Sequence, residues 1–506
     1  MSTNISTSPE GQSYPIPDDK VLESEFDLIR NAAAGREVVV VQGLGFVGAA
    51  VAVAVAAARN EVGRPRYFVV GVDLATPSAW WKVATINSGK SPFAASDPDF
   101  SRLLHEAVNV EKNLVATSCE GAYALPDVIF VDVQLDVVSA LSGAEDNIRV
   151  GLESYEKALR SIGRTMKPDA LVIVETTVPL GMTRKVIRPV IEEERSARGV
   201  TTPLRLAHAY ERVMPGKRYL DSIRKFWRVF AADDNYSAQA TMSFLESFTD
   251  ATEHPISRLH NSTASEMAKL LENSYRAANI AFVHEWTLLA EKAGVNLWEV
   301  VDAIRLRKGT HDNMRYPGFG VGGYCLTKDS YLAQWGATNL LQLECELPVT
   351  LAALAANFAM PLHTLDLVRE CAGGKLSGLR ILLCGVSYLA DVADTRNSPS
   401  LTFVDAAVAE GAEVLYHDSL VDVWPERPEI SRIEVVAGAL EQFDAIVFAV
   451  PHAEYSSIAP EDFHGKAIIV DASNIFNDDQ AFRLRGIGCR IAGAGKGHWR
   501  EMGWYK

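Results

Sequence analysis

Residues 38–58 read VVVVQGLGFVGAAVAVAVAAA, and this stretch decides the fold. A β-branched run leads into a centre that contains Gly43, Gly45 and Gly48, and an alanine-rich run follows. The stretch has one strongly polar member, Gln42, and is long enough to cross a bilayer. The order of β-branched, glycine-rich and alanine-rich parts instead predicts a buried strand, a tight turn and a buried helix.

The three glycines have the G-x-G-x-x-G spacing of a dinucleotide-binding turn, between a predicted strand and a predicted helix. The first glycine allows the tight turn, the second lets the backbone approach a pyrophosphate, and the third lets the helix pack on the strand. Asp73 ends the next apolar run, where a carboxylate binds the ribose diol and repels a 2′-phosphate. The pattern therefore predicts NAD as cofactor; the alternative is a glycine-rich packing turn with a helix-capping Asp.

Apolar runs alternate with helical stretches along the chain, in two separate series. The first contains 38–41, 67–72, 114–117, 128–133 and 171–174, and the second contains 379–384, 413–416, 444–449 and 467–470. Repeated strand–helix units predict a parallel sheet wrapped by helices. We expect an α/β protein with two doubly wound, Rossmann-like domains joined by a helical middle domain.

The middle stretch has few strand signals, and residues 262–293 have helical spacing with few breakers. We expect a long central helix there that serves as a dimerisation surface. The expected domains are a flexible extension (1–34), a cofactor domain (35–258), a helical middle domain (259–373) and a second Rossmann-like domain (374–506). The second series has only Gly385 after its first strand, which predicts a different nucleotide-bearing ligand there.

Composition excludes several classes of protein. The 506 residues are 48 % hydrophobic and 22 % charged, which is ordinary for a folded protein of about three domains. The net charge of −15 and the lack of a basic stripe argue against nucleic acid as a partner. The six cysteines form no CxxC pair, which predicts free thiols, no metal site and a reducing compartment. The polar N-terminus does not resemble a signal peptide, so we expect a cytoplasmic protein without a membrane segment.

A cysteine stands directly after a glycine-rich run. Residues 317–325 read PGFGVGGYC, and Lys328 and Asp329 follow. A cysteine near a lysine can act as a nucleophile, whereas a lone cysteine is usually a small buried hydrophobe. Oxidation of an alcohol to an aldehyde needs one hydride acceptor, but oxidation onward to an acid through a thioester also needs a thiol. The sequence therefore suggests a two-step oxidation.

Residues 37–500 resemble the nucleotide-sugar 6-dehydrogenase family, which includes UDP-glucose, UDP-N-acetylhexosamine and GDP-mannose dehydrogenases. The resemblance rests on seven blocks in the family's order: QGLGFVG at 42, INSGKSP at 86, ETTVPLGMT at 175, YERVMPGK at 210, EMAKLLENSYRAANIAFVHE at 266, GFGVGGYCLTKD at 318 and DVADTRNSPS at 391. It implies a four-electron, NAD-dependent oxidation of C6 of a UDP-sugar to the uronic acid. It also implies a UDP-sugar site in residues 374–506 and a homodimer or higher homo-oligomer.

The resemblance implies roles for five catalytic residues. Cys325 falls on the nucleophile and Asp329 on the carboxylate that assists thioester hydrolysis. Lys269 and Asn273 fall on the pair that holds the reacting oxygen, and their i, i+4 spacing places them on one helix face. Without the family, Lys269 reads as the partner of an ordinary helical salt bridge. Glu211 falls on a substrate-side acid/base and would otherwise read as solvated surface.

The remaining assignments are contacts to the two ligands. Those to the cofactor are Gly43, Gly45, Phe46, Val47, Gly48, Asp73, Thr177, Lys328 and Arg396. Those to the substrate are Glu211, Arg212, Lys269, Asn273, Tyr316, Gly322 and Tyr388.

Three positions depart from the family pattern. Leu135 stands where the family commonly has a threonine, and Leu389 stands where it often has a lysine near the diphosphate. Pro215 replaces the second glutamate of the glucose-type enzymes, which favours an N-acetylhexosamine substrate. Two alternatives stay open: a two-electron dehydrogenase, which acts without Cys325, and a nucleotide-sugar-binding protein with little turnover.

Overall fold

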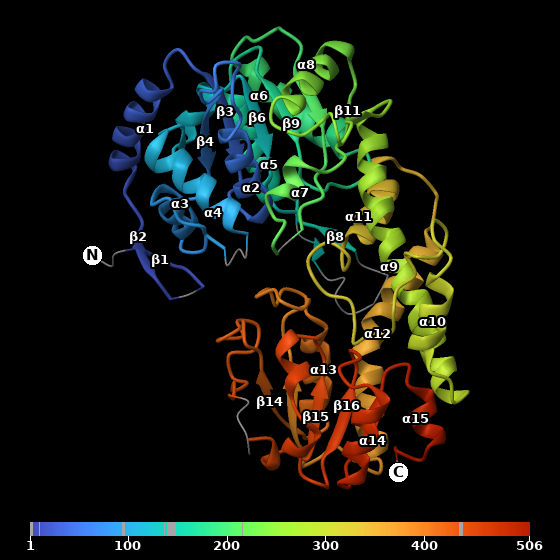
Figure 1. Cartoon of the computed structure of the whole chain (residues 1–506). Coiled ribbons are helices and arrows are strands. Elements are labelled where there is room, and N and C mark those ends of the chain that lie inside the picture. Colours follow the sequence, from blue (N-terminus) through green and yellow to red (C-terminus); the bar gives the residue numbers. More distant parts are fainter. Residues whose placement is uncertain are drawn as a thin grey trace. The chain divides into compact units, whose positions relative to one another are not determined.

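The computed structural model of the chain describes residues 4–9, 11–93, 97–135, 137–138, 148–214, 216–434 and 439–505. The chain forms two compact units (Figure 1). Unit 1 consists of Met1–Ser139, Ile148–Leu270 and Leu332–Cys345, and unit 2 includes Leu271–Tyr331 and Glu346–Lys506. Each unit is built on a sheet of mostly or entirely parallel strands, so the predicted α/β class with two Rossmann-like sheets is confirmed.

The sheet of unit 1 has the strand order β12-β11-β10-β9-β6-β3-β4-β5. All neighbouring strands are parallel except β10 and β11. The strands are β3 (Glu37–Gln42), β4 (Tyr67–Val72), β5 (Leu114–Thr117), β6 (Val128–Val131), β9 (Leu171–Val174), β10 (Arg205–His208), β11 (Val229–Ala232) and β12 (Ser257–Arg258). The first five lie on the five apolar runs of the first predicted series.

The strand order reverses direction at β3. From β3 the chain proceeds to β4 and β5 on one side, and then returns to β6 and β9 on the other. Because such crossovers are right-handed, the helices of the two halves cover opposite faces of the sheet. The helices between these strands are α2 (Phe46–Ala56), α3 (Trp80–Asn87), α4 (Pro98–His105), α5 (Glu153–Thr165), α6 (Arg188–Ala197), α7 (Asp221–Arg224) and α8 (Asn235–Glu246). The edge beyond β3 and β6 is therefore a switch point, where such folds bind nucleotides.

The N-terminal extension has defined secondary structure, which the prediction of a flexible segment did not include. Strands β1 (Ile5–Thr7) and β2 (Ser13–Pro15) form an antiparallel hairpin. Helix α1 (Asp19–Ala33) begins at Asp18, whose side chain accepts a hydrogen bond from Val21 N. It buries Leu22, Ile29 and Ala33. The polar composition of this segment gave no sign of these elements, because only a few apolar side chains in each of them pack against the rest of the protein.

Unit 2 contains a five-stranded parallel sheet with the order β14-β13-β15-β16-β17. Its strands are β13 (Arg380–Cys384), β14 (Glu413–His417), β15 (Ala445–Phe448), β16 (Ile468–Asp471) and β17 (Arg490–Gly493). Its helices are α10 (Leu297–Arg305), α12 (Pro348–Cys371), α13 (Pro399–Ala409), α14 (Asp478–Gly486) and α15 (Gly497–Glu501). The second predicted strand series is thus confirmed, and β17 extends it.

Two helices run from one unit into the other. The predicted central helix is α9 (Ser262–Lys292), which starts and ends within one residue of the expected bounds. The shorter helix is α11 (Asp329–Trp335).

Among the described residues, α12 alone is long and apolar enough to cross a membrane, and half of its apolar window is buried in the protein. The stretch 38–58 forms β3 and α2, as expected, rather than a single helix.

Candidate functional site

The turn between β3 and α2 has a shape that only glycine allows at two positions. Gly43 has a φ of +91°, and a Cβ on it would lie 2.5 Å from the carbonyl oxygen of Asp132. A Cβ on Gly48 would lie 1.9 Å from the carbonyl oxygen of Gly43. A Cβ on Gly45, the N-cap of α2, would meet nothing within 4 Å. The first and third glycines therefore close the turn, and the second leaves open space at the helix N-terminus.

That open space lies where α2 presents unpaired backbone N–H groups. Phe46 and Val47 open the helix, and the first N–H groups of a helix have no partner within it. They carry a partial positive charge that suits a pyrophosphate. The predicted cofactor residues of this turn are thus together in a cradle that fits a dinucleotide.

Asp73 directly follows β4 and faces the same turn. Its Oδ2 accepts hydrogen bonds from Leu44 N at 3.1 Å and from Lys82 Nζ at 2.6 Å, and its Oδ1 accepts one from Leu74 N at 2.8 Å. The carboxylate is thus fixed beside the glycine turn, as a ribose-binding acid requires. Thr177 is partly buried in the loop after β9.

A second group of side chains in unit 1 surrounds Glu211, which follows β10. Lys269, on α9, donates from Nζ to the Glu211 carbonyl oxygen at 2.8 Å and lies 3.4 Å from its Oε1. Both side chains are at most 9 % exposed. Arg212 donates to Tyr210 Oη at 3.1 Å and to the carbonyl oxygen of Trp227. Glu211 is therefore not the solvated surface residue of the alternative interpretation.

The structure also reveals a buried charged cluster that the sequence analysis missed. Asp132 follows β6, Glu175 follows β9, and Arg228 precedes β11 and pairs with Glu175. Burial raises the pKa of both carboxyl groups, and the proximity of each to Glu211 raises it further. The two carboxyl groups also contact each other, and one buried oxygen of each lacks a donor among the described residues. A proton shared between them would satisfy both oxygens. The available signal was a single acid directly after each apolar strand.

Unit 2 brings Asn273, Lys328 and Asp329 together. The Asp329 carboxylate is almost fully buried, at 1 % exposed, and accepts from Asn273 Nδ2 at 2.6 Å and from Lys328 Nζ at 3.0 Å. Asp329 N and Lys328 N both donate to the Cys325 carbonyl oxygen, at 3.0 and 3.2 Å. The chain therefore makes one turn between Cys325, which is exposed, and the held carboxylate.

The glycines before Cys325 allow close packing against the loop after β13. A Cβ on Gly322 would lie 2.6 Å from Tyr388 Cβ, and Gly323 N donates to the Arg396 carbonyl oxygen at 3.2 Å. Arg396 donates to both carboxylate oxygens of Asp394, and this pairing raises its pKa. Burial raises the pKa of Tyr388 to about 12. The glycines thus bring the segment before Cys325 against Tyr388 and Arg396, and the ligand contacts predicted for Gly322, Tyr388 and Arg396 stay predictions.

The other positions singled out in the sequence have different environments in the structure. Tyr316 stacks on Trp298 and donates to Asp302 Oδ1 at 2.6 Å, so its hydroxyl is engaged by α10. Leu135 is buried, at 1 % exposed, whereas Leu389 is 49 % exposed and supplies no cation. Pro215 lies outside the described residues.

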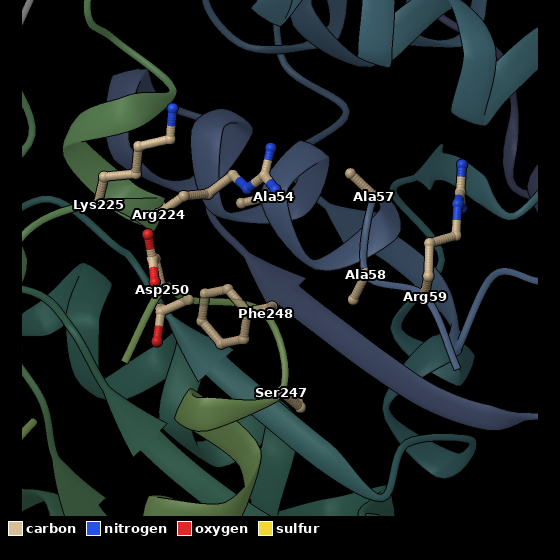
Figure 2. Close-up of a pocket in the computed structure, with 10 residues that line it drawn as sticks. Ala54, Ala57, Ala58, Arg59, Arg224, Lys225, Ser247, Phe248 and Asp250 are labelled. Carbon is tan, nitrogen blue, oxygen red and sulfur yellow. The ribbon is translucent and has the colours of Figure 1, made fainter. Parts of the chain in front are cut away.

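A cavity of about 330 Å³ lies at the far, C-terminal end of α2 from the glycine turn (Figure 2). Ala54, Arg59 and Arg224 are among the residues that line it. The cavity is therefore separate from the dinucleotide cradle. Among the described residues, no group of three or more His, Cys, Asp or Glu side chains is placed to hold a metal ion.

Three sequence models of the UDP-glucose/GDP-mannose dehydrogenase family match the chain. The NAD binding domain matches residues 37–246, the central domain residues 263–358, and the UDP binding domain residues 382–478. Together they cover most of the chain, in the order of the expected domains.

Individual relatives agree with this. UDP-N-acetyl-D-mannosamine dehydrogenase of Pyrococcus horikoshii is 32 % identical over 460 residues, which are 89 % of this chain and 99 % of that protein. Its solved structure has a TM-score of 0.76 and covers 91 % of this chain and 100 % of its own. The structure of NDP-N-acetyl-D-galactosaminuronic acid dehydrogenase from Methanosarcina mazei Go1 is 26 % identical, has a TM-score of 0.76, and covers 94 % and 98 %.

Proposed function

The chain belongs to the UDP-glucose/GDP-mannose dehydrogenase family, and from that premise we propose that it oxidises C6 of a UDP-linked sugar to the uronic acid. It is an NAD-dependent nucleotide-sugar dehydrogenase. The proposal adds the four-electron course and a UDP-N-acetylhexosamine or UDP-hexose as substrate. Two relatives named for N-acetylated sugars favour the N-acetylhexosamine.

One observation carries the four-electron course: a buried carboxylate stands one turn after an exposed cysteine. Asp329 is held by Asn273 and Lys328, and its own N–H bonds to the Cys325 carbonyl. An enzyme that stops at the aldehyde has no use for a thiol with a fixed acid beside it. A thioester intermediate needs both, since water must be oriented and activated to release the acid.

In the proposed reaction, NAD supplies the hydride acceptor in each of two oxidations. The first removes a hydride from C6 and a proton from its hydroxyl group, and leaves an aldehyde. The Cys325 thiol adds to the aldehyde carbon, which gives a thiohemiacetal. The second oxidation converts this to a thioester, and water then releases the carboxylic acid and restores the thiol.

The side chains on α9 suit stabilisation of the reacting oxygen. The Lys269 ammonium and the Asn273 amide stand one helical turn apart and are each 6 % exposed. A donor placed on a developing oxyanion typically lowers a barrier by about 3 kcal/mol. Glu211, bonded to Lys269, is the proposed proton acceptor.

The proposal also assigns the parts of the chain. Residues 35–258 bind NAD, residues 259–373 carry the cysteine, and residues 374–506 bind the UDP-sugar. None of the six cysteines, all of which lie in the described residues, forms a disulfide bond, which supports a protein of the reducing cytoplasm.

The test compares two exposed cysteines. Purified wild type, Cys325→Ala and Cys345→Ala are incubated with excess NAD and each of UDP-glucose, UDP-N-acetylglucosamine and UDP-N-acetylmannosamine, and the acid is quantified by mass spectrometry. We expect acid from one sugar with wild type and Cys345→Ala, and none with Cys325→Ala. Full acid formation by Cys325→Ala would overturn the thioester course, and binding without turnover would support the binding-protein alternative.

A further inference from the structure

The N-terminal hairpin lies outside the part of the chain that matches the family's NAD-binding domain, which begins at residue 37. It nevertheless forms buried hydrogen bonds within unit 1. The side chain of Ser6, on β1, is fully buried. Its hydroxyl donates to the Pro77 carbonyl oxygen at 2.7 Å and accepts from Trp81 N at 2.9 Å. Ser6 is thus hydrogen-bonded to the loop between Asp73 and α3 and to the start of α3, some seventy residues later in the chain.

The second of these bonds has the chemistry of a helix cap. Helix α3 begins after Ala79, whose side chain cannot accept a hydrogen bond. The first N–H groups of a helix need an acceptor, which a serine, threonine, asparagine or aspartate normally supplies from the N-cap position. Here Ser6 supplies it to Trp81, the second residue of α3, from another element. Trp81 N therefore depends on the hairpin for its acceptor, whereas Trp80 N and Lys82 N donate to the carbonyl oxygens of Thr76 and Ala79.

Tyr14, on β2, makes a further contact with the same helix. Thr85 Oγ1 lies 3.1 Å from Tyr14 Oη, and Thr85 also donates to the Trp81 carbonyl oxygen at 2.7 Å. Both strands of the hairpin therefore contact α3 by hydrogen bonds.

Helix α3 in turn holds the carboxylate beside the glycine turn. Lys82 follows Trp81 and places its Nζ 2.6 Å from Asp73 Oδ2. The same oxygen accepts from Leu44 N in the turn itself. A continuous path thus leads from Ser6 through the start of α3 and Lys82 to Asp73, and both charged side chains are mostly buried along it.

We infer that Ser6 is a positioning residue for NAD: the N-terminal hairpin caps α3 and thereby holds Lys82 and Asp73 in the geometry that binds the adenosine ribose. The inference rests on the proposed ribose-binding role of Asp73. It gives the extension a specific task, because Ala79 at the N-cap position of α3 has no side-chain acceptor to offer Trp81 N.

The test is the affinity for NAD, measured by calorimetry on the full-length protein. Ser6→Ala removes both hydrogen bonds and is expected to raise the dissociation constant for NAD about fivefold, the factor that corresponds to loss of one helix cap. Tyr14→Phe is expected to raise it less. Thr7→Ala, an exposed neighbour on the same strand, is the matched control and leaves NAD affinity unchanged.

Affinity for UDP distinguishes a specific effect of Ser6 on NAD binding from general destabilisation, because the UDP binding domain belongs to unit 2. We expect UDP affinity to be unchanged in Ser6→Ala, and KM for NAD to rise while KM for the sugar does not. Unchanged NAD affinity in Ser6→Ala overturns the inference. If Ser6→Ala does not fold, Tyr14→Phe provides the same test by the same two affinities. Asp73→Asn separates the role of Ser6 from the role of Asp73. If Asp73→Asn binds NAD as tightly as wild type, the ribose-binding role of Asp73 is rejected.

Discussion

At the scale of single residues, Asp73 is the acid on which we propose that cofactor choice depends. It accepts from one backbone N–H of the glycine turn, from Leu74 N and from Lys82. A negative charge fixed there binds a ribose diol and repels a 2′-phosphate. Lys82 beside it would attract that phosphate once the carboxylate charge is removed.

Asp73→Asn should therefore lower the preference for NAD over NADP by roughly tenfold, which corresponds to about 1.4 kcal/mol. The ratio of kcat/KM for the two cofactors measures it. Asp127→Asn is a matched control, because Asp127 also accepts from a backbone N–H and a lysine, but it precedes β6 and so lies at the amino-terminal ends of the strands, whereas Asp73 follows the carboxyl end of β4. An unchanged ratio in Asp73→Asn would reject the ribose contact.

At the scale of elements, His208 joins the end of β10 to the start of α9. Its Nδ1 lies 2.9 Å from Ser265 Oγ, and complete burial lowers its pKa from 6.5 to about 4. The unfolded chain therefore binds a proton between pH 6.5 and 4 that the folded chain does not bind. Stability contributed by the neutral imidazole is present above pH 6.5 and is lost as the pH falls toward 4.

The loss attributable to His208 is at most about 3 kcal/mol, given 1.36 kcal/mol per unit of pKa. Denaturation midpoints of wild type and His208→Gln at pH 7.5 and pH 5 measure it. We expect a smaller fall with acid in the variant, whatever its stability at pH 7.5. The buried His284, whose pKa is also lowered to about 4, is present in both proteins and cancels in the comparison. Equal falls would show that His208 does not carry this acid sensitivity.

Elements with a clear local pattern of apolar residues could be predicted from the sequence. Features that depend on contacts between residues far apart in the chain could not. The run 38–41 and the long helix near 262–293 were found because apolar spacing reflects burial within one element. The short strand β11 and the cap from Ser6 to Trp81 depend on residues far along the chain. The Asp132–Glu175 contact also depends on residues far apart in the chain. The two acids come together only because β6 and β9 are neighbouring strands.

At the scale of the whole molecule, α9 presents an apolar face to solvent. Leu271, Tyr275, Phe282, Trp286 and Leu289 on it are each 48–64 % exposed. Their spacing keeps them along one side of the helix. Such a continuous exposed stripe is unusual on a monomer and supports the predicted homodimer.

Trp286→Glu should shift the protein from dimer to monomer, as measured by light scattering after size-exclusion chromatography. Burying a charge in an apolar contact without a partner opposes association. Val62→Glu is the control, because Val62 is an exposed apolar residue that does not belong to α9. A Trp286→Glu protein that remains dimeric would exclude this face as the interface.

The central claim is that one active protein carries a sugar alcohol through two oxidations, because Cys325 captures the aldehyde and Asp329 assists release of the acid. The most direct test is the end-point yield of NADH from a limiting amount of the preferred UDP-sugar with excess NAD. The account predicts two NADH per sugar consumed. A yield of one NADH per sugar would contradict it.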